Sequence, residues 1–143
     1  MLHAERQAAM IWEGNLAQGK GKISLGSVAV EELPMTWAAR AEHPGGKTSP
    51  EELIAAAHAS CFAMALSLGL ATAGFPPKHL DTSARVTFGP PEGIQAIHLT
   101  VKGKVPGIDA AVFSAAVDDA RANCPVSKAL AAVPITAEAT LEL

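Results

Sequence analysis

The chain has 143 residues, enough for one domain with a substantial core, and carries a net charge of −3. Aromatic residues make up only 4% and tyrosine is absent, so neither charge nor stacking favours binding to nucleic acid or to an anionic membrane. Two cysteines are too few for a secreted disulfide scaffold. We therefore expect a single domain over residues 1–143, without a signal peptide in residues 1–10, and a cytoplasmic location that keeps thiols reducible.

The first fifty residues are expected to form short strands joined by turns. Gln7–Trp12 is an apolar run that ends at a Glu-Gly-Asn turn signal and predicts the first strand. Ile23–Leu25 and Val28–Val30 predict a hairpin with that strand. Met35–Arg40 predicts a third strand with Arg40 at its end, and the glycine-rich loop 42–47 then leads to the centre of the chain.

A long helix is predicted from Thr48 to Gly74. Thr48 or Ser49 can cap its N-terminus, and Pro50 fits the first turn, where a missing N–H group costs nothing. Ser49 and Glu52 also match the spacing of a capping box. The glycine at the end of the segment and the two prolines that follow it terminate the helix.

The central part of this helix is apolar on almost every side. No residue between Leu53 and Leu68 is charged unless His58 is protonated, and a helix of this kind is expected to be buried. Its length also approaches that of a membrane span. We exclude a membrane span because His58, Ser60 and Ser67 are polar, alanine is abundant and the helix starts with two glutamates.

The second half of the chain is expected to contain two strands, two helices and a last strand. Clustered strands favour an α+β fold with antiparallel sheets over a doubly wound fold. A single chain of this size is expected to leave part of the apolar helix uncovered, so we predict a homodimer that packs two such helices together. The predicted segments are strands Leu80–Phe88 and Ile94–Val105, helices Ile108–Asn123 (capped by Asp109) and Val126–Val133, and strand Ile135–Leu143.

The two cysteines differ in their local surroundings. Cys61 lies in the middle of the long helix among apolar neighbours, which would raise the pKa of its thiol and make it an inert core residue. Reaction with a peroxide needs the thiolate, so a reactive Cys61 requires a nearby cation. Cys124 precedes Pro125 and falls at or next to the N-cap of the last predicted helix, where backbone N–H groups favour a thiolate.

The remaining chemistry-bearing residues form few patterns. Neither a Cys-x-x-Cys pair nor a His-Glu-x-x-His motif nor a Gly-x-Ser-x-Gly elbow occurs in the sequence, so we expect no metal site and no serine hydrolase. His58 lies three residues before Cys61 and can share a helix face with it. A hydrogen-bonded core histidine, a proton-transfer neighbour of Cys61 and a metal ligand are the alternatives for this residue.

The motifs of the sequence resemble those of one known family. The segments TSPEELIAAAHASCFAMALS and NCPVSKAL are similar to the OsmC/Ohr family of osmotically inducible and organic hydroperoxide resistance proteins. WEGN with GKGK, Arg40 before a glycine loop, AGFPP, VPGIDAAVF and the final alternating strand extend the resemblance over nearly the whole chain. VPGID and AAAHASC resemble the OsmC branch more than the Ohr branch.

This resemblance implies a thiol peroxidase that reduces organic hydroperoxides, and also hydrogen peroxide, in defence against oxidative or osmotic stress. It implies that Cys61 is the peroxidatic cysteine, Cys124 the resolving cysteine, Arg40 the residue that assists the thiolate and Glu51 the partner of that arginine. Glu52 is the alternative partner. It further implies no cofactor apart from an external dithiol reductant, and an obligate intertwined homodimer with sheets wrapped around central antiparallel helices.

Helix geometry adds one hypothesis and leaves one alternative function. Glu51 and Cys61 are ten residues apart, about 15 Å along a helix, so we expect the Glu51 and Arg40 of each active site to be supplied at the dimer interface. The alternative is a non-catalytic, stress-related dimer on the same fold that binds a small molecule or serves only a structural role. Four apolar residues are candidates either for a substrate entrance or for plain core: Phe62, Met64, Leu66 and Phe75.

Overall fold

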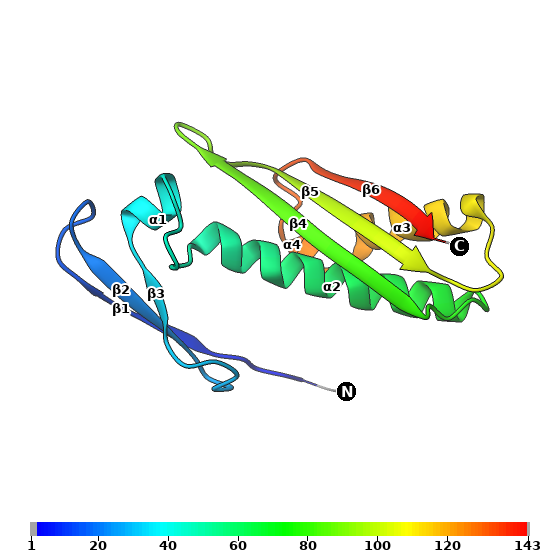
Figure 1. The fold of residues 1–143 in the computed structure, drawn as a ribbon, viewed down its shortest axis with the longest axis horizontal. Coiled ribbons are helices and arrows are strands. Elements are labelled where there is room, and N and C mark those ends of the chain that lie inside the picture. Colours follow the sequence, from blue (N-terminus) through cyan, green and yellow to red (C-terminus); the bar gives the residue numbers. More distant parts are fainter. Residues whose placement is uncertain (1–2, 143) are drawn as a thin grey trace. The chain divides into compact units, whose positions relative to one another are not determined.

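A computed structural model describes residues 3–142, and Figure 1 shows its strands and helices. The chain forms two compact units, residues 1–50 and 51–143. The α+β class is as predicted. The elements are β1 (Ala8–Glu13), β2 (Lys20–Leu25), β3 (Leu33–Met35), α1 (Trp37–Ala41), α2 (Pro50–Thr72), β4 (His79–Gly89), β5 (Gly93–Lys104), α3 (Ala110–Asn123), α4 (Pro125–Ala129) and β6 (Ile135–Glu142).

The N-terminal unit contains the antiparallel sheet β1-β2-β3. Strands β1 and β2 pair from Ala8 opposite Leu25 to Glu13 opposite Lys20, so the predicted hairpin exists. Its second strand, β2, contains the predicted Ile23–Leu25, whereas the predicted Val28–Val30 segment is not a strand: it follows a turn at residues 26–27, and Val28 has a φ of 57°. Strands β1 and β2 approach each other closely at Gly21, since a Cβ added there would lie only 2.7 Å from the sulfur of Met10.

The predicted third strand, Met35–Arg40, is correct only at Met35, and the rest of the prediction is wrong. Strand β3 ends at Met35, and α1 follows at once. Thr36 is the N-cap of α1, and its hydroxyl accepts a hydrogen bond from the Ala39 N–H at 3.1 Å. The alanines and the arginine that follow Trp37 are good helix formers, so the capped turn outweighs the tendency of a short apolar run to extend.

The C-terminal unit is built on the sheet β4-β5-β6, with β5 in the centre. Strands β4 and β5 pair antiparallel from His79 opposite Lys104 to Gly89 opposite Gly93. Strand β6 pairs parallel to β5, from Ile97 opposite Ile135 to Lys104 opposite Glu142. The expectation of purely antiparallel sheets is therefore wrong for this pair, because α3 and α4 form a crossover that returns the chain to the start of β5. Leu143, the end of the last predicted strand, lies outside the described residues.

Helices α2, α3 and α4 lie on one side of this sheet, behind it in the view of Figure 1. Every second residue in the central part of β5 is apolar and belongs to the core between the sheet and the helices. Helices α2 and α3 contribute to the same core with apolar residues that are three or four positions apart. The hydroxyl of Thr82 on β4 also donates to the carbonyl of Ala59 on α2 at 3.1 Å. The buried residues of this core include Phe62, Leu66, Leu70, Ile97, Leu99, Val101, Phe113, Val117 and Ala120.

The C-terminal unit covers only one stripe of α2. The side chains of Met64 and Leu68, on the opposite side from the core, are 68% and 71% exposed. The prediction of a helix buried all round is therefore not met within the C-terminal unit, because its three strands and two other helices enclose only one side of α2. By length and composition alone α2 could also cross a membrane, a property that it shares with many core helices.

Candidate active site

The two cysteines come from distant parts of the sequence and meet beside α2. Cys61 lies in the middle of α2, whereas Cys124 is both the C-cap of α3 and the N-cap of α4. As predicted from Pro125, the Cys124 sulfur caps the last helix by accepting the Ser127 N–H at 3.4 Å. Cys124 is buried, Cys61 is half-buried, and both are free thiols.

The environment of Cys61 holds it as a thiol. Burial raises the pKa of Cys61, and a hydrogen bond and the charge interaction with Cys124 raise it further, while the backbone N–H of Val126 lowers it. Both cysteines line the same groove, and Cys61 packs against the core cluster that contains Cys124. The raised pKa agrees with the expectation that nothing on α2 itself activates Cys61.

Hydrogen bonds connect Cys124 to two further polar side chains, Ser127 and His58. The Cys124 thiol donates to the Ser127 hydroxyl oxygen at 3.1 Å, and that oxygen lies 2.7 Å from Nε2 of His58. Ser127 and His58 are both buried. His58 is thus a buried, hydrogen-bonded histidine, and burial lowers its pKa, which favours the neutral imidazole. Sequence reasoning missed Ser127, although a serine three residues after a capping cysteine was the available signal.

Both cysteines belong to the lining of a largely apolar groove. Its volume is about 650 Å³, and it lies between α2 and the segment that joins α3 to α4. Of the four residues considered for a substrate entrance, only Met64 lines this groove, whereas Phe62 and Leu66 are core residues and Phe75 packs against the core. The full lining is Cys61, Met64, Ala65, Leu68, Gly69, Thr72, Asp119, Ala120, Asn123, Cys124 and Pro125.

The other two predicted site residues, Arg40 and Glu51, do not join the cysteines within the C-terminal unit. Arg40 lies in α1 of the N-terminal unit, where its guanidinium carbon is 5.8 Å from the centre of the Trp37 ring. There it lines a cavity of about 300 Å³ together with Trp12 and Trp37. Glu51 lies in the first turn of α2, about 15 Å along the helix from Cys61. Glu52 occupies the same turn.

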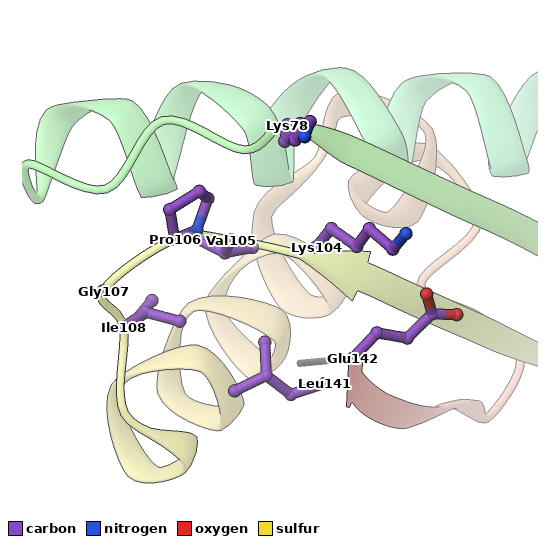
Figure 2. Close-up of a pocket in the computed structure, with 8 residues that line it drawn as sticks. All are labelled: Lys78, Lys104, Val105, Pro106, Gly107, Ile108, Leu141 and Glu142. Atoms are coloured by element: carbon purple, nitrogen blue, oxygen red, sulfur yellow. The ribbon is translucent and has the colours of Figure 1, made fainter.

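Another pocket of the C-terminal unit lies around the segment that joins β5 to α3 (Figure 2). Its volume is about 450 Å³, and its charged residues are Lys78, Lys104 and Glu142. It contains no nucleophilic cysteine and no histidine. Among residues 3–142, no three histidine, cysteine, aspartate or glutamate side chains are grouped closely enough to hold a metal ion.

Comparison with known sequences identifies the family. The model of the family described as OsmC-like protein matches residues 43–138, which is more than half of the chain. Peroxiredoxin OsmC of Escherichia coli K12 is 44% identical over 134 residues, covering 92% of each chain, and Peroxiredoxin OsmC of Shigella flexneri matches equally well. The chain belongs to the OsmC-like family, and these relatives support the OsmC branch.

Solved structures of the same fold agree with this assignment. The OsmC-like protein from Mycoplasma pneumoniae has a TM-score of 0.74 at 14% identity, covering 99% of this chain and 100% of that chain. The organic hydroperoxide resistance protein OhrB of Bacillus subtilis has a TM-score of 0.67 at 23% identity, covering 95% and 98%. At these identities the likeness concerns the fold, which confirms the predicted OsmC-like α+β architecture.

Proposed function

We propose that this protein is a cytoplasmic thiol peroxidase that reduces organic hydroperoxides, with Cys61 as the peroxidatic cysteine and Cys124 as the resolving cysteine. The observation that supports the proposal is that these two thiols, 63 positions apart in the sequence, line the same groove. The name of the relatives, Peroxiredoxin OsmC, supports a peroxidase that acts in stress defence. The apolar groove beside Cys61 offers space for the organic part of a hydroperoxide.

The reaction follows from the chemistry of a thiolate. The Cys61 thiolate attacks the terminal peroxide oxygen, the O–O bond breaks, and an alcohol leaves after protonation while Cys61 becomes a sulfenic acid. Cys124 then displaces hydroxide from the Cys61 sulfur, giving a disulfide and water. An external dithiol reduces the disulfide by thiol–disulfide exchange and becomes oxidised itself. No further cofactor enters this cycle.

The cation that Cys61 needs is Arg40 in this proposal. Because Glu51 is about 15 Å from the Cys61 of its own helix, we assign Arg40 and Glu51 to a composite site formed by a homodimer. The exposed Met64 and Leu68 on α2 are apolar surface that a second copy would cover. A guanidinium beside the sulfur offsets the effect of burial on the thiol and makes the thiolate available.

Mass spectrometry after addition of one equivalent of cumene hydroperoxide tests the cysteine roles. The reduced protein is expected to lose two hydrogens without gaining oxygen, which is the signature of a Cys61–Cys124 disulfide. Cys61→Ser is expected to abolish peroxide consumption, and Cys124→Ser to gain oxygen and accumulate over-oxidised Cys61 without turnover. Full turnover by Cys61→Ser would refute the assignment. A binding or structural dimer would leave both the protein mass and the peroxide concentration unchanged.

A further inference from the structure

The resolving half of the site contains a buried hydrogen-bonded chain that the peroxidase cycle has not used so far. It runs from the Cys124 sulfur to the Ser127 hydroxyl at 3.1 Å and from that hydroxyl to Nε2 of His58 at 2.7 Å. All three side chains are at most 3% exposed. The residues come from α2, α4 and the cysteine that joins α3 to α4, so packing of the helices assembles the chain.

Counting donors and acceptors fixes the direction of these hydrogen bonds. Ser127 has one hydroxyl proton, and its oxygen already accepts the Cys124 S–H. If His58 Nε2 accepts the hydroxyl proton, one buried group remains unsatisfied, namely Nδ1–H of the imidazole. If Nε2 instead donates, both the Ser127 hydroxyl proton and Nδ1 lack partners. Nδ1 of His58 is the one buried side-chain nitrogen or oxygen atom without a hydrogen-bond partner in the described part of the chain.

We propose that Ser127 is a catalytic residue and His58 a positioning residue of the resolving step, together forming a relay that takes the proton from Cys124 when it attacks the Cys61 sulfenic acid. This inference rests on the proposed function. A neutral imidazole is the acceptor that such a relay needs, and the buried surroundings of His58 keep it neutral. The hydrogen bonds of the pair lead to Cys124, so the relay acts on the second step of the cycle alone.

The proton and electron balance of the step is simple. The thiol proton of Cys124 moves to Ser127 as the hydroxyl proton of Ser127 moves to Nε2 of His58. The Cys124 sulfur forms the S–S bond and is oxidised, while the S–O bond of Cys61 breaks and its sulfur is reduced. The departing hydroxide leaves as water after taking up the proton that the relay returns, and His58 becomes neutral again.

Single-turnover kinetics separate the two steps. The reduced protein is mixed with one equivalent of cumene hydroperoxide, quenched at intervals, and analysed by mass for sulfenic acid and disulfide. Peroxide consumption is expected to be unchanged in Ser127→Ala and His58→Gln, whereas disulfide formation slows about 10²-fold in both. Glutamine can keep the hydrogen bond to Ser127 but cannot take its proton, so a structural role predicts a normal His58→Gln.

The pH profile of disulfide formation provides the second measurement. In both variants the rate of disulfide formation is expected to rise about tenfold per pH unit, because only hydroxide from solvent can then take the proton of Cys124. The unaltered protein is expected to show a flatter profile near neutral pH. The other titratable groups that face Cys124 are Cys61 on α2 and Asp119 of α3 in the same groove, and both variants retain them.

Two control variants guard against misfolding. Ser127→Thr keeps the hydroxyl and is expected to restore disulfide formation relative to Ser127→Ala. Ser67→Ala makes the same change at a half-buried position on α2 outside the relay and is expected to behave as the unaltered protein. Normal disulfide formation in His58→Gln, or equal slowing of both steps in the two variants, would overturn the relay. Absence of peroxide consumption by the unaltered protein would instead refute the proposed function, and the relay with it.

Discussion

Single residues decide whether the two thiols of this protein can react. Burial raises the pKa of Cys61 and the neighbouring Cys124 raises it further, so that at neutral pH only a small fraction is thiolate unless a cation adjoins it. The reacting species is the deprotonated form, and its fraction therefore grows as the pH rises toward that raised pKa. The proposed role of Arg40 is to move this titration to lower pH.

Arg40→Met tests this role at the first step of the cycle. Loss of the guanidinium is expected to displace the pH profile of Cys61 oxidation upward, and a displacement of about one pH unit slows the reaction at pH 7 about tenfold. Stopped-flow measurement of peroxide consumption between pH 5 and pH 10 records the profile, with Arg40→Lys as the variant that keeps the charge. An unchanged profile in Arg40→Met would remove Arg40 from the mechanism.

At the residue scale, sequence reasoning reached the cysteines better than their neighbours. The position of Cys124 at a helix N-cap followed from Pro125, because proline at the first helical position is a local signal. The hydrogen bond between His58 and Ser127 joins residues 69 positions apart, so no local pattern could predict it. The same is true of the groove that Cys61 and Cys124 share, since the spacing of the two cysteines in the sequence does not predict it.

At the scale of elements, capping explains both the successes and the main error. Asp109 was predicted as the cap of α3, and its carboxylate accepts the Val112 N–H at 2.9 Å. Thr36 caps α1 by the same kind of hydrogen bond, but the segment after it is only five residues long, and its apolar residues resembled a strand. A single helical turn has too few residues to show the 3.6-residue periodicity. The parallel β6 also escaped prediction, since strand direction depends on the crossover and not on side-chain alternation.

The cap of α3 yields a stability prediction. Asp109→Ala is expected to lower the free energy of unfolding by about 1 kcal/mol, because the N–H of Val112 loses its acceptor at the start of the helix. Asp109→Asn keeps an acceptor oxygen and is the matched control, with an expected change of only a few tenths of a kcal/mol. Urea unfolding followed by circular dichroism measures both. Equal destabilisation by the two substitutions would mean that the charge, and not the cap, stabilises α3.

At the scale of the whole molecule, the exposed apolar surface of α2 and the separation of Glu51 from Cys61 point to the same assembly. The C-terminal unit covers a single stripe of α2 and leaves Met64 and Leu68 exposed in the lining of the groove that contains Cys61. In a homodimer with antiparallel α2 helices, the start of one helix approaches the middle of the other. The Glu51 of each chain would then serve the Cys61 of its partner.

Complementation between two inactive variants tests this composite site. Cys61→Ser retains Glu51, and Glu51→Gln retains Cys61, so a mixed dimer contains one site with both residues if they come from different chains. Co-expression of the two variants with different affinity tags is expected to give about a quarter of the normal number of sites, since about half of the dimers are mixed and one of their two sites is intact. If both residues act within one chain, the purified mixed dimer gains no activity over the separate variants. Leu68→Glu in both chains tests the surface itself: a charge on the apolar face of α2 is expected to raise the dimer dissociation constant about 10²-fold, whereas Ala115→Glu on the exposed side of α3 leaves it unchanged.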